Sequence, residues 1–204
     1  MLDIIRIEIA DVNFLIKCDN LILLQDYAPS YKTFLKSDKN SIAGDINISI
    51  KVNTIPGTGG MTRIFESGQS WSMFQNVNDY FVVMNSPAFN QNQIWAAQFD
   101  HNVTSVDVFL GEMLLEKSNS KVTIPNLISY PLDQILLMYF LAQRQGILIH
   151  AAGLDINGKG YIFPGKSGAG KSTLSRLFLG RDTAEMLSDD RIIIRKIDGK
   201  FKAF

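Results

Sequence analysis

Residues 165–172 read Gly-Lys-Ser-Gly-Ala-Gly-Lys-Ser, which is the G-x-x-x-x-G-K-[ST] spacing of a phosphate-binding loop. Glycines in such a loop let the backbone wrap a phosphate chain so that several N–H groups point inward. In this spacing Lys171 supplies a mobile positive charge for the β- and γ-phosphates, and Ser172 supplies a hydroxyl for Mg²⁺. The predicted phosphate-binding residues are therefore Gly165, Lys166, Ser167, Gly168, Ala169, Gly170, Lys171, Ser172 and Thr173.

The segments on either side of this loop have the strand and helix patterns that the motif needs. Residues 160–163 are short, apolar and aromatic, which is typical of a buried strand. After the loop, Leu174, Leu177 and Phe178 fall on one helical face of a helix expected over 172–179. The start of that helix would direct free amides at the phosphates. A glycine-rich turn ahead of a helix would explain the glycines, but not the lysine and serine that end the motif.

Two carboxylates follow the loop along the chain. Phosphoryl transfer needs a carboxylate that holds Mg²⁺ or takes the proton of the acceptor. Asp189 and Asp190 come after a short apolar stretch and supply a pair. Adjacent strand residues point to opposite faces, so only one aspartate faces a metal unless the strand ends or bends there. The alternative is that both are turn residues ahead of a strand at 191–197.

Composition excludes several classes of protein. The chain has 204 residues, of which 46% are hydrophobic, so it can bury a sizeable core. Twenty basic and twenty acidic residues give a formal net charge of zero, and no polybasic run occurs. This balance argues against nucleic acid or an anionic membrane surface as the main partner.

The compartment is indicated by the cysteine count and by the first residues. Cys18 is the only cysteine, so no internal disulfide can form, and we interpret it as a small buried hydrophobe on a strand. The start of the chain lacks the basic segment of a signal peptide. The most apolar stretch, 132–141, is too short to span a bilayer. We therefore expect a cytoplasmic protein with no membrane partner.

Residues 1–125 are expected to form a mostly antiparallel β domain. Runs with strand-like alternation or strand-forming residues are separated by turn signals such as the segment 76–79. The expected strands lie at 4–9, 11–17, 46–52, 71–74, 80–84, 93–99 and 104–110.

Residues 126–204 are expected to form a second domain that contains both helices and strands. The fold class expected for the whole chain is therefore α/β, of the α+β type. A buried helix is predicted over 132–145, with Gly146 as its cap. Strand-like runs at 147–153 and 154–156 lead through an Asn-Gly turn into the strand before the loop. An Asp-Gly turn at 198–199 predicts a final hairpin.

Four segments of this second domain resemble the HPr kinase/phosphorylase superfamily, in particular HPr-kinase-like proteins of bacterial gene clusters. They read Gly-Ile-Leu-Ile-His-Ala-Ala-Gly at 146–153, Asn-Gly-Lys-Gly at 157–160, Phe-Pro-Gly-Lys-Ser-Gly-Ala-Gly-Lys-Ser-Thr-Leu at 163–174 and Leu-Ser-Asp-Asp-Arg at 187–191. This order of histidine, turn, loop and aspartate pair is more specific than the loop alone. The match covers about the last third of the chain.

The resemblance implies a fold and an activity. The fold would be a phosphoenolpyruvate-carboxykinase-like P-loop core with a mixed sheet. The activity would be transfer of the γ-phosphoryl group of ATP, with Mg²⁺, to a serine-type hydroxyl of a protein, a peptide or a small molecule. Lys171 would hold phosphates, and Ser172 with Asp189 would bind the metal. One of Asp189 and Asp190 would act as acid or base, and His150 would be the active-site histidine near the phosphates.

Several alternatives stay open from the sequence. Members of the family continue beyond the point that matches Phe204, with a further catalytic glutamate and arginine, so the resemblance implies a C-terminally incomplete core. A nucleotide-binding interaction module without catalysis is therefore the main alternative to a kinase. A carboxykinase-type decarboxylase is disfavoured because His101 and His150 are the only histidines for its additional metal. The acceptor, a reverse reaction and homo-oligomerisation are left undecided.

Overall fold

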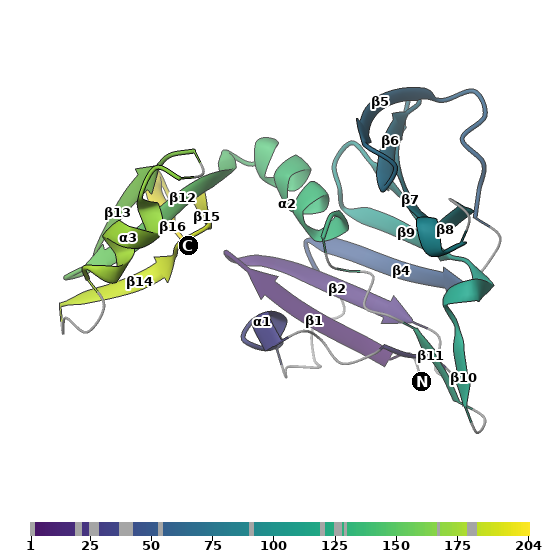
Figure 1. Cartoon of the computed structure of the whole chain (residues 1–204), viewed down its shortest axis with the longest axis horizontal. Helices are drawn as coiled ribbons and strands as arrows, with labels where there is room; N and C mark the ends of the chain where they lie inside the picture. The colour runs from purple at the N-terminus through teal and green to yellow at the C-terminus, as the bar shows by residue number, and fades with distance from the viewer. Residues whose placement is uncertain are drawn as a thin grey trace. The chain divides into compact units, whose positions relative to one another are not determined.

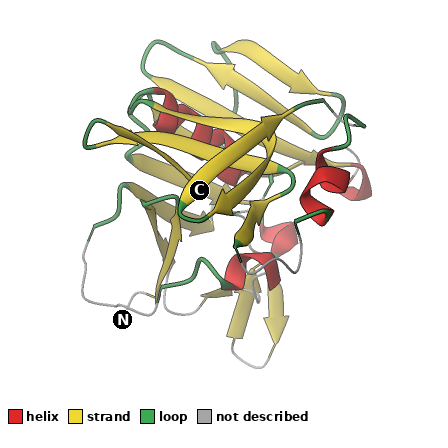
Figure 2. Cartoon of the chain, turned by 90° about the vertical axis from the view of Figure 1, so that its left-hand side faces the viewer, coloured by secondary structure: helices red, strands yellow, loops and turns green. Residues whose placement is uncertain are grey.

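The chain forms an α+β structure in which strands predominate and helices are few (Figure 2). The fold is taken from a computed structural model that describes residues 3–18, 22–24, 29–36, 43–52, 55–89, 92–118, 121–124, 128, 130–166, 168–178 and 183–204. It divides into two compact units, Met1–Leu136 and Leu137–Phe204, and the division falls inside helix α2 (Leu132–Ala142). The boundary expected at 125/126 lies earlier in the chain and stays a prediction.

The N-terminal unit is built on an eight-stranded sheet with the order β1-β2-β4-β9-β8-β7-β6-β5 (Figure 1). A small sheet, β10-β11-β3, accompanies it. The elements are β1 (Asp3–Ile9), β2 (Val12–Cys18), β3 (Ile22–Leu24), α1 (Pro29–Lys32), β4 (Ile46–Val52), β5 (Thr62–Ser67), β6 (Trp71–Gln75), β7 (Asp79–Ser86), the 3₁₀ turn η1 (Pro87–Phe89), β8 (Asn92–Asp100), β9 (Ser105–Leu110), the 3₁₀ turn η2 (Glu112–Leu114), β10 (Glu116–Ser118) and β11 (Lys121–Ile124).

The large sheet is mixed. Antiparallel pairs such as β1–β2, β6–β7 and β8–β9 join strands that follow one another along the chain. The β2–β4 and β4–β9 pairs are parallel. Parallel neighbours need a long connection, and the chain makes one between the strands of each of these pairs. The edge strand β5 was not among the expected strands.

The large sheet buries apolar side chains on both faces, and Phe81, Val83 and Ala96 form a buried cluster on one of them. On β4 the alternate residues Ile46, Ile48 and Ile50 are buried, as their spacing predicted. The paired positions on neighbouring strands, such as Phe14 and Val106, are buried on the same face. Full burial of each such side chain contributes about 1.5–3 kcal/mol. Cys18, at the end of β2, is buried as expected.

Helix α2 begins where it was predicted and ends earlier. The carbonyl of Pro131 accepts the N–H of Ile135 at 3.0 Å, which is the first bond of the helix. The left-handed residue after the helix is Gln145, with φ 52, whereas Gly146 already belongs to the next strand. The prediction of Gly146 as the cap was therefore wrong. No helix in the described part of the chain is long and apolar enough to cross a membrane.

The C-terminal unit is a five-stranded sheet with one short helix against it. Its elements are β12 (Gly146–Ile156), β13 (Lys159–Pro164), α3 (Lys171–Arg176), β14 (Ala184–Ser188), β15 (Arg191–Ile197) and β16 (Lys200–Ala203). Every described strand pair in this unit is antiparallel, whereas a mixed sheet was expected here. The Asn-Gly and Asp-Gly turns are confirmed, because both residues of each turn have positive φ.

Strands β14 and β15 lie one after the other along the same edge of β12. β14 pairs with Gly153–Ile156, and β15 pairs with Gly146–His150. The register shifts by one residue beside Gly153, which makes Leu187 an extra, bulged residue. Asp189 and Asp190 occupy the bend between the two strands. The strand therefore does end at the aspartate pair, which is the condition under which both side chains can reach one site.

Gly153→Ala should destabilise the C-terminal unit by about 1–3 kcal/mol because β12 packs closely there. A Cβ at Gly153 would lie 2.3 Å from Cδ1 of the buried Ile192. Gly160→Ala is the matched control, since its Cβ would meet only Ala203 Cβ at an ordinary 3.7 Å. Urea denaturation of both variants measures the difference. Equal losses at the two positions would contradict the close packing.

Candidate functional site

The loop between β13 and α3 has the backbone that the motif predicts. Gly168 and Gly170 have φ of +80 and +85, a region that other residues rarely adopt. The N–H of Ala169 donates to the carbonyl of Lys166 at 3.1 Å, which closes a tight turn inside the loop. Ser167 lies outside the described residues. Glycine at 168 and 170 is thus required by conformation, independently of any ligand.

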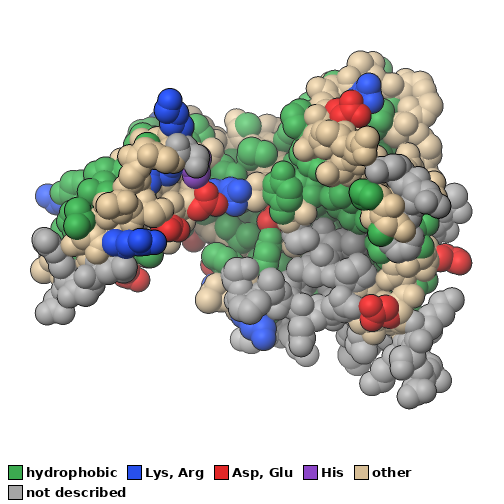
Figure 3. All heavy atoms as spheres, in the orientation of Figure 1, with side chains coloured by type: hydrophobic (Ala, Val, Ile, Leu, Met, Phe, Trp, Pro, Cys, Tyr) green, Lys and Arg blue, Asp and Glu red, His purple; other side chains and the backbone are tan. Residues whose placement is uncertain are grey.

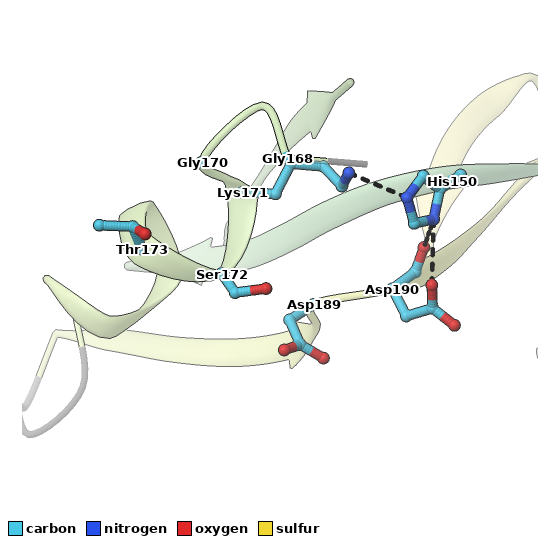
Figure 4. Close-up of a pocket in the computed structure, with 8 residues that line it drawn as sticks. All are labelled: His150, Gly168, Gly170, Lys171, Ser172, Thr173, Asp189 and Asp190. Carbon is cyan, nitrogen blue, oxygen red and sulfur yellow. Dashed lines mark hydrogen bonds and ion pairs between the residues drawn. The ribbon is translucent and has the colours of Figure 1, made fainter. Parts of the chain in front are cut away.

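A cavity of about 390 Å³ opens beside this loop (Figure 4). It is lined by His150, Gly168, Gly170, Lys171, Ser172, Thr173, Asp189 and Asp190. These residues come from β12, from the loop and first turn of α3, and from the bend after β14. The structure thus brings together three segments that the sequence analysis had selected separately. Of the other predicted residues, Gly165, Lys166 and Ala169 belong to the loop without lining the cavity.

Lys171 is held by its own loop and by a histidine. Its ammonium donates to the carbonyls of Gly165 at 2.6 Å and Lys166 at 3.1 Å, and to His150 Nε2 at 2.9 Å. An ammonium only donates, so Nε2 of His150 must accept. The proton of a neutral imidazole then sits on Nδ1, from which it donates to the carbonyl oxygen of Asp190 at 2.8 Å. The same nitrogen lies 3.0 Å from Asp190 Oδ1.

Asp190 is fixed from two sides. Its carboxylate contacts His150 through Oδ1, and Arg191 Nη1 lies 3.1 Å from Oδ2. The hydroxyl of Ser188 shapes the bend, because it accepts the N–H groups of Asp190 and Arg191 at 3.3 Å each. Sequence reasoning assigned no role to Ser188 or Arg191. The signal available for Ser188 was its place at the start of a turn, where serine often accepts nearby backbone N–H groups.

Asp189 differs from Asp190 in having no such partners. Its carboxylate lines the cavity and is directed away from His150 (Figure 4). Within the described part of the chain it makes no hydrogen bond or ion pair. Ser172, on the first turn of α3, brings its hydroxyl to the same cavity. The aspartate pair therefore consists of one constrained carboxylate and one uncommitted carboxylate.

The oxygen donors of this cavity fit Mg²⁺. Mg²⁺ prefers oxygen ligands and commonly takes one or two carboxylates, with phosphate oxygens and water completing its shell. Asp189 supplies an uncommitted carboxylate and Ser172 a hydroxyl. Among the described residues there is no group of three or more His, Cys, Asp or Glu placed to hold a metal. A metal here would therefore depend on a phosphate ligand for part of its shell.

The site lies on the surface of the C-terminal unit. The space-filling view shows a histidine of this unit with acidic and basic side chains close to it (Figure 3). Both His150 and Asp190 are about half exposed. The cavity is thus accessible from solvent.

Comparison of the chain with protein-family models, with curated proteins and with solved structures gave no match. What the cavity binds must be inferred from its own residues and from the motif spacing.

In the nucleotide-free protein His150 should carry its proton on Nδ1, because Lys171 donates to Nε2. Heteronuclear NMR of the imidazole nitrogens reads the tautomer directly. Lys171→Ala removes the donor to Nε2 and should change the Nε2 signal, while the proton stays on Nδ1 because the carbonyl and carboxylate oxygens of Asp190 still accept from it. His101, the only other histidine, is the internal control and should not change. A wild-type His150 that is mainly the Nε2–H tautomer would contradict the hydrogen-bond chain.

Proposed function

We propose that the protein binds ATP with Mg²⁺ and transfers the γ-phosphoryl group to a serine-type hydroxyl of a protein, peptide or small molecule. The observation that carries this proposal is the single cavity that joins the phosphate loop to His150 and to the aspartate pair. A loop that only bound phosphate would need neither an uncommitted carboxylate nor a histidine beside its lysine. The resemblance to HPr-kinase-like proteins supports the same reaction.

Binding of the phosphate chain is assigned to the loop. Gly168, Gly170 and the first turn of α3 line the cavity from one side, and backbone N–H groups of such a loop can bind phosphate oxygens. Lys171 reaches the phosphates by exchanging the carbonyls of Gly165 and Lys166 for phosphate oxygens. Charged oxygens are the stronger acceptors, which favours the exchange. The same movement withdraws the ammonium from His150 Nε2.

The transfer step assigns different roles to the two aspartates. The acceptor oxygen forms a bond to the γ-phosphorus while the bond from that phosphorus to the β–γ bridging oxygen breaks, and ADP leaves. The hydroxyl proton goes to a carboxylate. Ser172 and Asp189 would hold Mg²⁺, which would neutralise charge on the phosphates. One of the two carboxylates takes the proton: Asp189, whose oxygens are uncommitted, holds the metal or accepts the proton, and where it holds the metal the proton passes to Asp190, which also orients His150.

Lys171→Ala should abolish transfer from γ-labelled ATP, with a loss of about 10²-fold or more, because a charge that stabilises the transferring group is removed. The assay incubates the protein with Mg²⁺, labelled ATP and cell extract, and then identifies the labelled species. Chelation of Mg²⁺ should abolish labelling as well. Lys159→Ala, an exposed lysine at the start of β13, is the matched control and should keep full activity. Retained transfer by Lys171→Ala would rule out the proposed kinase.

ATP binding that depends on Lys171, without labelling of any species, would favour the alternative of a non-catalytic nucleotide-binding module. Isothermal titration of wild type and Lys171→Ala with ATP measures nucleotide binding directly. It distinguishes a kinase or a non-catalytic binding module, both of which bind ATP, from a protein that binds no nucleotide.

Asp189→Asn should reduce the rate constant of transfer more than Asp190→Asn does, because only Asp189 has uncommitted oxygens. We expect losses of about 10²-fold or more at Asp189 and smaller losses at Asp190. The rate of transfer and the affinity for ATP are measured for both variants in parallel. Asp190→Asn should also perturb the imidazole signals of His150, which Asp189→Asn should leave in place. A larger loss of rate for Asp190→Asn than for Asp189→Asn would assign to Asp190 the role proposed for Asp189.

A further inference from the structure

A second cavity, of about 420 Å³, lies within the N-terminal unit. Its charged and amide side chains are Arg6, Glu8, Asn13, Lys36 and Asp45. It is formed at β1 and β2, on the face of the large sheet opposite to Phe14 and Ile46. None of these residues was selected from the sequence, and the proposed kinase reaction uses none of them.

The walls of this cavity are fixed by backbone contacts. The N–H of Lys36 donates to the carbonyl of Arg6 at 3.1 Å, and the N–H of Glu8 donates to the carbonyl of Phe34 at 2.9 Å. On the other side, Gly44 packs so closely that a Cβ there would lie 2.7 Å from the carbonyl oxygen of Asn13. Two chain segments are thus held against the β1–β2 pair, with the cavity between them.

Two of the four charges in the cavity satisfy each other. Lys36 Nζ lies 3.0 Å from Glu8 Oε1. Asp45 accepts the N–H of Asn13 at 2.8 Å and its side-chain amide at 3.3 Å. No lysine, arginine or histidine of the described chain pairs with the Asp45 carboxylate. Asp45 is an exposed residue that is oriented by the Asn13 amide groups, and no counter-charge lies beside it among the described residues.

Arg6 is the remaining cation, and it lacks an acceptor. Its Nε and Nη2 atoms are buried and have no hydrogen-bond partner in the described structure. Buried donors of this kind are rare in native proteins and call for a specific explanation. A guanidinium is the side chain best suited to bind a carboxylate through two parallel hydrogen bonds. One cavity thus presents an unpaired cation and an unpaired anion.

We propose that this cavity binds a small zwitterion that carries both a carboxylate and an ammonium group, of the free amino acid or short peptide class. The carboxylate pairs with Arg6, and the ammonium pairs with Asp45. A simple anion would satisfy Arg6 but would leave the Asp45 carboxylate without a counter-charge. The volume lies at the small end of the range for ligand sites, which suits a ligand of this size.

The test is a binding screen on the full chain. Saturation-transfer NMR with the standard L-amino acids and a set of dipeptides identifies a ligand, and calorimetry then measures its affinity. For each ligand two analogues are titrated: the N-acetyl form, which lacks the cation, and the methyl ester, which lacks the anion. Both analogues should bind about tenfold more weakly or worse, because each loses one charge-assisted contact.

Variants of the protein test the same two contacts by changing Arg6 or Asp45 instead of the ligand. Arg6→Gln and Asp45→Asn should each weaken binding by about tenfold or more. Arg63→Gln is the matched control, because this exposed arginine on β5 pairs only with Glu66 at 3.2 Å. Arg6→Lys keeps the charge without the planar fork and should bind with intermediate affinity, and it replaces Arg6→Gln if that variant does not fold.

Three results would overturn the proposal. Absence of binding by the wild type at millimolar concentrations of every probe is the first. Equal affinity for an amino acid and its N-acetyl form is the second, because it would indicate an anion site without a role for Asp45. Unchanged affinity in folded Arg6→Gln or Arg6→Lys protein is the third.

Discussion

Strand β12 is paired on both of its edges, and the candidate kinase site is assembled by that pairing. On one edge β13 leads into the phosphate loop, and on the other edge β14 and β15 lie in succession with the aspartate bend between them. His150 projects from the part of β12 that faces β15 and reaches both the loop lysine and Asp190. A sheet holds such distances more rigidly than a loop, because each backbone hydrogen bond in the ladder limits the movement of its neighbours. The groups of the candidate site are therefore positioned by one backbone element.

The chain of contacts from Lys171 through His150 to Asp190 gives the site two electrostatic states. While the Lys171 ammonium donates to His150, it also donates to the carbonyls of Gly165 and Lys166 in its own loop. With the ammonium on a phosphate, Nε2 of His150 is left without its donor. Nucleotide binding would thus alter the hydrogen bonding of a group that also touches Asp190. In the proposed function, a phosphate at one end of the cavity would in this way affect Asp190 at the other end.

Features marked by short sequence patterns could be predicted, and features that depend on distant pairing could not. The loop spacing at 165–172, the Asn-Gly and Asp-Gly turns and the alternation on β4 each reflect a local rule of backbone geometry. The parallel pairs of β4 and the one-residue shift at Leu187 involve partners far apart in the sequence, which no local pattern marks. The same reason explains Arg191 and Arg6. Arg191 and Arg6 matter because of the side chains that lie beside them in space. For the same reason the pattern at Gly146 did not show that this residue begins β12 instead of capping the helix.

The order in which the ladders of β12 can form follows from their connections. The β12–β13 and β15–β16 hairpins close over two-residue turns, and such hairpins form within about 1–10 μs. The β12–β15 ladder must bring together segments separated by the loop, α3 and β14, so its loop-closure entropy is larger. During folding the strand that leads into the loop can therefore be in place before the aspartates arrive. In the proposed kinase, the phosphate-binding side of the site would then begin to form before the carboxylates are in position.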